Sequence, residues 1–187
     1  STIANPSTCA TGGRRSASGA CGRFKVSTGA IGRTRIGALQ SHLMPCLTGS
    51  ARFASEVAQE QIANIRRGEH ELNRMKAMVE EAVKILHSPS ASIGEFGELL
   101  HESWTCKKEL STKVSTAAID ELYAAALDAG ATGGKILGAG GGGFLLLFVK
   151  PELQAGVKER LKHLVHVPFS FDEGGSRVVL YQPNGLH

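Results

Sequence analysis

A glycine-rich segment in the C-terminal half of the chain is the strongest chemical signal in the sequence. Five of the six residues 138–143 are glycine, in the run KILGAGGGGF that begins at Lys135. Glycine lets the backbone adopt a positive φ and approach a ligand closely, and successive N–H groups in such a segment can form a concavity that binds an anion. The segment therefore indicates a phosphate-binding site, and a glycine-rich hairpin that serves only tight packing is the alternative.

Two common phosphate-binding motifs are excluded by the context of this segment. Gly138, Gly140 and Gly143 have the spacing GxGxxG, but a dinucleotide-binding loop must lead into a helix. Here the glycines lead into the apolar run FLLLFV, which is typical of a buried strand. A P-loop needs its lysine after the glycines, whereas Lys135 precedes them. A loop between two strands remains.

Five further polar residues are candidates for contact with a substrate. Lys107 and Lys108 end a predicted helix, where they would either neutralise a phosphate group or form a solvated basic helix end. Thr48 and Ser50 follow a predicted strand, and they would either hydrogen-bond a substrate or cap the next helix. Lys135 would either attract phosphate or stand exposed at the start of a strand.

Histidine and cysteine spacing argues against a metal site. The seven histidines form neither HxxxH nor HExxH, and the four cysteines contain no CxxC pair. The same scatter argues against a disulfide framework. We expect reduced thiols in a cytoplasmic protein, with Cys46 and Cys106 in the core because apolar residues flank them.

The net charge of +4 is unevenly distributed along the 187 residues. Residues 1–40 contain six Lys or Arg and no acidic residue, whereas the other 147 residues contain 15 basic and 17 acidic side chains. The body is therefore mildly acidic, and the first segment has only Phe24 for stacking on a base. These features argue against a nucleic-acid partner. The longest apolar run, residues 144–149, is far shorter than the roughly 20 residues of a membrane-spanning helix, so we expect no membrane partner.

The first 38 residues differ in composition from the rest of the chain. They are rich in Ser, Thr, Gly, Ala and Arg, and their apolar residues follow no helical or strand period. We predict that residues 1–38 are a disordered or non-native basic segment, and that one domain covers residues 39–187. An organellar transit peptide is a third interpretation of the segment.

Apolar periodicity predicts an α+β domain in which helices pack on a small, mostly antiparallel sheet. Strands are expected at 43–47, where Pro45 suggests an edge or a bulge, and at 144–149. The sequence Ser92-x-x-Glu95 is a capping box that begins a helix, and Pro151 suits the first turn of another. The remaining predicted elements are helices near 51–67, 69–87 and 115–129 and strands at 135–137, 167–171 and 177–181.

Several stretches of the sequence resemble the GHMP kinases. The run GKILGAGGGGFLLLF at 134–148 is similar to the third conserved motif of this family. The runs HESWTCKKELS at 101–111, IDELY at 119–123 and LTGSARFASE at 47–56 are similar to its D-glycero-D-manno-heptose 7-phosphate kinase branch. The resemblance covers about Leu39 to Pro183 and implies the ferredoxin-like C-terminal lobe of such a kinase.

The resemblance implies an activity and a set of site residues. GHMP kinases transfer the γ-phosphoryl group of ATP, with Mg²⁺, to a small-molecule acceptor, here a heptose phosphate or a related sugar. It implies that Gly138, Ala139, Gly140, Gly141 and Gly142 lie against the nucleotide phosphates, with Gly140 and Gly141 nearest. It leaves Thr48, Ser50, Lys107 and Lys135 as substrate-binding candidates.

The resemblance also implies that parts of the kinase are absent from these residues. Nothing in the sequence matches the PxxxGLGSSAA-like phosphate loop of the N-terminal lobe. The family's catalytic Asp and Mg²⁺ carboxylate also precede the C-terminal lobe. We therefore expect the chain to be inactive by itself, to need an N-terminal kinase lobe as partner, and to self-associate through the surface that such a lobe covers. The alternative is a non-catalytic small-molecule-binding or regulatory module derived from a GHMP kinase, and the DNA upstream of Ser1 would distinguish the two.

Overall fold

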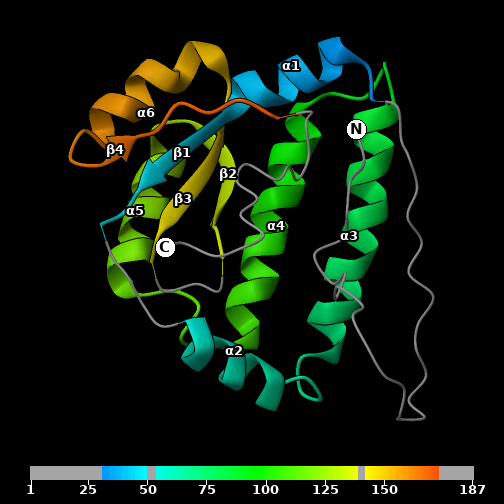
Figure 1. Cartoon of the computed structure of the whole chain (residues 1–187), viewed down its shortest axis with the longest axis vertical. Helices are drawn as coiled ribbons and strands as arrows, with labels where there is room; N and C mark the ends of the chain where they lie inside the picture. The colour runs from blue at the N-terminus through cyan, green and yellow to red at the C-terminus, as the bar shows by residue number, and fades with distance from the viewer. Residues whose placement is uncertain (1–30, 50–53, 139–141, 173–187) are drawn as a thin grey trace, which may run out of the picture. The chain divides into compact units, whose positions relative to one another are not determined.

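The computed structural model describes residues 31–49, 54–138 and 142–172, and Gly32–Phe171 form one compact unit (Figure 1). Its described elements combine helices with an antiparallel sheet, as in an α+β domain, which confirms the predicted fold class. They are α1 (Arg33–His42), β1 (Leu43–Leu47), α2 (Ala54–Ala63), α3 (Glu69–His87), α4 (Gly94–Leu110), α5 (Ala117–Asp128), β2 (Ala131–Ile136), β3 (Phe144–Val149), the 3-10 turn η1 (Pro151–Leu153), α6 (Gln154–Arg160) and β4 (Val165–His166).

The four described strands form one sheet in the order β2-β3-β1-β4, and all neighbours are antiparallel. The chain leaves β1 for the helices α2 to α5, returns through β2 and β3, and passes through α6 to β4. This path and strand order are those of a ferredoxin-like fold, as predicted, with additional helices inserted after β1.

The main core lies on one face of the sheet. Leu145, Leu147 and Val149 alternate along β3 and are fully buried, as a strand with period two requires. They pack in one cluster with apolar side chains of α5 and α6, among them Ile119, Ala126, Val157 and Leu161.

Helix α4 lies along β2, and α3 packs on α4 from the outer side (Figure 1). On the α4 side of the sheet, Phe148 is buried against Phe96 and stacks on the His42 ring with 5.0 Å between centroids. A Cβ atom on Gly133 would lie 2.1 Å from the Gly97 carbonyl oxygen, and one on Gly97 would lie 2.5 Å from Phe148 Cδ1. Both glycines are therefore needed for helix and sheet to approach this closely.

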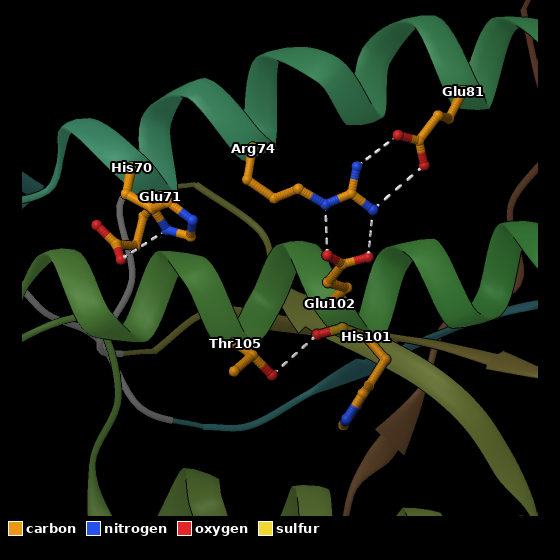
Figure 2. A network of polar contacts seen from close by, with 7 residues as sticks. All are labelled: His70, Glu71, Arg74, Glu81, His101, Glu102 and Thr105. Carbon is orange, nitrogen blue, oxygen red and sulfur yellow. Dashed lines mark hydrogen bonds and ion pairs between the residues drawn. The ribbon is translucent and has the colours of Figure 1, made fainter.

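An arginine joins α3 to α4 (Figure 2). The Arg74 guanidinium donates to both carboxylate oxygens of Glu102 on α4, with Nε–Oε1 at 2.5 Å and Nη2–Oε2 at 2.6 Å. Its Nη1 and Nη2 also donate to Glu81, seven residues further along α3. The planar guanidinium suits two such bidentate contacts, which fix how α3 lies on α4.

Local signals mark the start of α4, as predicted, and both ends of α5. At the start of α4, the Ser92 N–H donates to Glu95 Oε1 at 2.9 Å, and Ser92 Oγ accepts from the Gly94 N–H at 3.2 Å. Thr116 caps α5 by accepting from the Ile119 N–H at 3.2 Å. Gly130 follows α5 with φ of 106°, a conformation that favours glycine.

Helix α1 was not predicted. It begins at Arg33, inside the segment 1–38 that we expected to lack regular structure. The helix carries no apolar stripe of its own, so periodicity gave no signal. Long-range contacts support it instead, since Arg35 Nη2 donates to the Ile85 carbonyl at 2.7 Å and Gln40 Oε1 accepts from the Phe171 N–H at 3.1 Å.

The expected place of Pro45 at a sheet edge is wrong, because β1 lies between β3 and β4. Proline is tolerated there because β4 has only two residues and the Val167 N–H donates to the Pro45 carbonyl, at 3.0 Å. The predicted strand at 167–171 is not formed, since β4 ends at His166. The predicted strand at 177–181 lies outside the described residues.

Helix α2 ends earlier than predicted, and part of its predicted apolar face is exposed. It stops at Ala63, where Asn64 begins a turn and donates from Nδ2 to the Leu110 carbonyl at 3.0 Å. Val57 is buried as expected, but Ile62 is 67% exposed and Ile65 is 49% exposed.

Candidate functional site

The glycine segment connects β2 to β3, the two antiparallel strands on either side of it. The ladder extends to Leu137, whose N–H donates to the Phe144 carbonyl at 2.8 Å. Gly138 and Gly143 have φ of 81° and 91°, in the region that side chains rarely adopt. A strand therefore follows the glycines, as predicted, and the helix that a dinucleotide-binding loop requires is not there.

Two predicted site residues hold the ends of this segment. Thr48, directly after β1, donates from its backbone N–H and from Oγ1 to the Gly143 carbonyl, at 2.9 and 2.8 Å. Lys107 of α4 donates from Nζ to the Gly138 carbonyl at 2.7 Å. The end of β1 and the helix α4, which are distant in sequence, thus both contact the connection between β2 and β3.

The other predicted residues of the segment are placed only in part. Gly138 is exposed, and a Cβ atom there would meet nothing within 4 Å. Gly142 is half-buried. Ala139, Gly140 and Gly141, like Ser50, lie outside the described residues.

A second half-buried lysine lies near the end of β2, before the glycine segment. Lys135 of β2 stands opposite Leu146 in the sheet register and on the same face of the sheet as Phe148, the face toward α4. Burial lowers the pKa of Lys107 to about 8, and the positive charge of Lys135 contributes to that lowering. Burial also lowers the pKa of Lys135. Both lysines are therefore half-buried.

Lys108 does not join this pair. Its Nζ lies 3.2 Å from Asp120 Oδ1, and Ser115 Oγ donates to the same oxygen at 3.0 Å. Lys108 therefore links the end of α4 to the first turn of α5 through Asp120.

Sequence reasoning missed the contacts around Gly133 and Gly134. His101 Nδ1 of α4 and Tyr123 Oη of α5 lie 2.6 Å apart beside β2, the outer strand of the sheet, and their rings are stacked. Burial raises the pKa of Tyr123 to about 12, against a smaller lowering by a hydrogen bond with the Gly134 backbone. A Gly-Gly pair inside a strand signals close backbone approach, and that signal would have pointed to these contacts.

Three exposed apolar side chains form a row across the sheet. Leu47 of β1 pairs with Phe144 of β3 on one side and with Val165 of β4 on the other. Directly paired residues share a face, so the three side chains lie side by side. Leu47 and Phe144 are each 37% exposed, and Val165 is 60% exposed.

Among the described residues, no group of three or more His, Cys, Asp or Glu side chains is placed to hold a metal ion. Within the same part of the chain, no helix is both long and apolar enough to cross a membrane.

Comparison with known proteins agrees with this architecture. Residues 78–166 match the family model described as GHMP kinases C terminal. Over 114 residues the chain is 32% identical to the D-glycero-alpha-D-manno-heptose 7-phosphate kinase of Campylobacter jejuni, a match that covers 60% of this chain and 33% of that protein. The chain thus spans about a third of that relative.

Solved structures share the fold at lower identity. The mevalonate kinase of Methanococcus jannaschii is 21% identical with a TM-score of 0.58, over 70% of this chain and 40% of that one. The Streptococcus pneumoniae phosphomevalonate kinase, solved with phosphomevalonate and AMPPNP, is 21% identical with a TM-score of 0.54, over 67% of this chain and 39% of that one. Residues 78–166 are thus similar to the C-terminal domain of the GHMP kinases, and the solved structures share the fold of this part of the chain.

Proposed function

We propose that the chain is the C-terminal part of an ATP-dependent sugar-phosphate kinase that transfers a phosphoryl group to a heptose phosphate or a related sugar. The observation that carries this proposal is the glycine segment between β2 and β3, held at Gly138 by Lys107 and at Gly143 by Thr48. The 32% identity to the heptose 7-phosphate kinase supports the choice of acceptor.

The chemistry of the site fits the phosphate side of that reaction. Phosphoryl transfer depends on positioning the phosphates and cancelling their charge. A glycine segment with no side-chain atoms at Gly138 leaves room for phosphate oxygens against the backbone, and Lys107 and Lys135 supply positive charge nearby. ATP would supply the transferred group, and these residues would hold and orient its phosphates or those of the acceptor.

Magnesium does not fit the same residues. Mg²⁺ prefers carboxylate and phosphate oxygens, and the described residues contain no acidic cluster placed to hold it. We assign its carboxylate, with the main ATP loop and the catalytic Asp, to an N-terminal kinase lobe that these 187 residues do not match. We therefore propose that the chain alone has no kinase activity.

The row of Leu47, Phe144 and Val165 is our candidate surface for that lobe. It lies on the sheet beside Thr48 and Gly143, so a lobe packed there would stand next to the glycine segment. The chain by itself would then self-associate through the same row. Because ATP-dependent sugar kinases work where ATP is made available, we place the protein in the cytoplasm.

A chimaeric enzyme tests the proposed function. The C-terminal part of the Campylobacter relative is replaced by residues 43–187 of this chain, and release of ADP is measured with ATP, Mg²⁺ and heptose 7-phosphate. We expect turnover by the chimaera and none by the 187-residue chain. Turnover by the chain alone would contradict its inactivity.

The alternative function is a small-molecule-binding or regulatory module, favoured by the basic pair at Lys107 and Lys135 in a site without described carboxylates. A folded chimaera that binds the sugar phosphate but never releases ADP would favour this alternative over the kinase.

A further inference from the structure

We propose that the pocket between α1, α6 and β4 binds a small carboxylate with an apolar tail, and that Lys158 and His166 hold its carboxylate group. The pocket has a volume of about 430 Å³. It shares no lining residue with the glycine segment or with Thr48 and Lys107, which contact that segment. The proposal is therefore independent of the kinase function proposed above.

The register of the sheet places His166 on the side that faces α6. His166 pairs with Cys46 across β4 and β1, so the two side chains share a face of the sheet. Cys46 is fully buried, in the core cluster that also contains Val157 of α6. The imidazole therefore lies on the face of the sheet that α6 covers, and Figure 1 shows α6 and β4 next to each other.

Helix α6 brings a positive charge to the same pocket. Lys158 and Gln154 are four residues apart on α6, so they lie on one face of the helix, and both line the pocket together with His166. The charge of Lys158 also acts on Cys46: burial raises the pKa of that thiol to about 11, and Lys158 opposes the rise. An ammonium group from α6 and an imidazole from β4 thus line one pocket.

One nitrogen of the His166 imidazole has a partner, whereas the other has none. Nδ1 lies 3.3 Å from Cys46 Sγ. Because its pKa is raised to about 11, the thiol keeps its proton near pH 7, and we assign that proton to the contact with Nδ1. The neutral ring then carries its own hydrogen on Nε2, which is buried and has no hydrogen-bond partner among the described residues. A buried donor without a partner is unfavourable, and a bound acceptor would remove that cost.

The other polar side chains of the pocket already have hydrogen bonds within the chain. Gln154 Nε2 donates to the Ser41 carbonyl at 2.6 Å, and Ser41 Oγ donates to a carbonyl of its own helix at 2.9 Å. Gln40 Oε1 accepts a backbone N–H at 3.1 Å. Of the polar side chains that line the pocket, the Lys158 ammonium and the His166 Nε2–H are therefore the two that would meet a ligand.

A carboxylate matches these two groups in charge and in hydrogen bonding. It has one negative charge and two acceptor oxygens, one for the ammonium and one for the imidazole N–H. A phosphate dianion would bring a second charge, and Lys158 is the only Lys or Arg among the described residues that line the pocket. The other walls are largely apolar and include Leu43, Pro45 and Phe169. Pockets of this size bind small molecules mainly through such surfaces, so the rest of the ligand is expected to be apolar.

Binding of phenylacetate to the whole 187-residue chain tests the proposal, with the neutral isostere phenylacetamide as the matched control. Both affinities are measured by NMR titration at pH 7. We expect phenylacetate to bind at least tenfold more tightly than phenylacetamide, and we expect inorganic phosphate not to displace it. Equal affinity for the two compounds, displacement by phosphate, or no saturation at millimolar phenylacetate would overturn the proposal.

Four variants assign the binding to Lys158 and His166. Lys158→Met and His166→Phe are expected to weaken binding at least fivefold, whereas Lys162→Met and His163→Phe, at exposed residues outside the pocket, change it less than twofold. Urea unfolding of each variant shows whether it is folded.

The ring nitrogen resonances of the wild type give a readout that needs no variant. Phenylacetate is expected to shift Nε2 of His166 and to leave the ring of His163 unchanged. Unchanged His166 resonances at saturation, or equal weakening by all four variants, would contradict the site.

Discussion

At the scale of single residues, Gly133 and Gly97 determine how closely α4 approaches the sheet. Gly133→Ala would place a methyl group 2.1 Å from a backbone carbonyl oxygen, which no side-chain rotation can relieve. We expect the variant to lose about 3 kcal/mol of unfolding free energy, the upper range for overpacking, as measured by urea denaturation.

Gly156→Ala is the matched control for that change. A Cβ at Gly156 meets nothing within 4 Å, and the residue lies inside α6. Alanine there is expected to add roughly 0.5–1 kcal/mol, because glycine in a helix is entropically unfavourable. Equal stability of the two variants would show that α4 and β2 are not in contact as described.

Lys107 makes the stability of the fold depend on pH. Its folded-state pKa of about 8 lies below the ordinary value of 10.5, so between these values the unfolded chain binds more protons than the folded one. Stability contributed by this group therefore rises as pH increases from about 8 to 10.5, and is lost as pH falls through 8.

The difference in unfolding free energy between the wild type and Lys107→Met isolates that contribution. The other titrating groups are the same in both proteins, so their contributions cancel in the difference. We expect the unfolding free energy of the wild type to rise relative to that of Lys107→Met between pH 7.5 and pH 10. A difference that stays constant over this range would mean that Lys107 is not buried.

The residue types at the candidate site were predictable from the sequence, but the contacts that these residues make were not. Thr48, Lys107 and Lys135 were each candidates from sequence, because a hydroxyl or an ammonium beside a glycine segment suits phosphate. The contacts of Thr48 with Gly143 and of Lys107 with Gly138 depend on how α4 and β1 pack on β2 and β3. No local pattern records such packing, and the same holds for the Lys108–Asp120 pair.

At the scale of elements, Arg74 fixes α3 on α4 through Glu102. Arg74→Met is expected to lower the urea midpoint clearly more than Lys162→Met, whose pair with Glu159 is about three-quarters exposed on both sides. High salt should reduce the effect of the Arg74 change.

The Arg74 contact also has a predictable response to acid. Its hydrogen bonds lower the pKa of Glu102 below the ordinary 4.5. The stability it contributes is therefore present above that value and is lost as pH falls through the lowered pKa. If Arg74→Met and the wild type lose stability in parallel below pH 4.5, the contact does not stabilise the fold.

Helices with strong local signals were predicted best. α3 was expected near 69–87 and spans Glu69–His87, and α5 lies inside the predicted 115–129. α1 and β4 were missed or misplaced because they are short and depend on partners elsewhere in the chain. Arg35 on Ile85 supports α1, and pairing with Cys46 and Leu47 defines β4.

At the scale of the whole molecule, the apolar row on the sheet predicts self-association of the chain. Val165, at its exposed end, can be changed to serine with little loss of buried area. Sedimentation velocity is expected to show concentration-dependent association of the wild type that Val165→Ser reduces and Ile62→Ser, at an exposed site on α2, does not. A wild-type chain that stays monomeric and binds no hydrophobic dye would contradict this prediction.

The similarity to the GHMP kinases was recognisable from the glycine segment and its flanks, and residues 78–166 match their C-terminal domain. The chain spans about a third of the heptose 7-phosphate kinase that it matches. The central claim is that the glycine segment takes part in phosphoryl transfer. The family resemblance implies that Gly140 is one of the two glycines nearest the nucleotide phosphates, so a valine side chain there is expected to hinder the approach of phosphate to the backbone.

The most direct test is therefore kcat of the chimaeric kinase carrying Gly140→Val, measured beside its urea midpoint and beside a chimaera carrying Gly156→Ala. We predict a fall in kcat of at least 100-fold, or roughly 3 kcal/mol of transition-state stabilisation, with the urea midpoint nearly unchanged and full activity in the Gly156 variant. Normal turnover by the Gly140→Val chimaera would reduce the segment to a packing element and contradict the account.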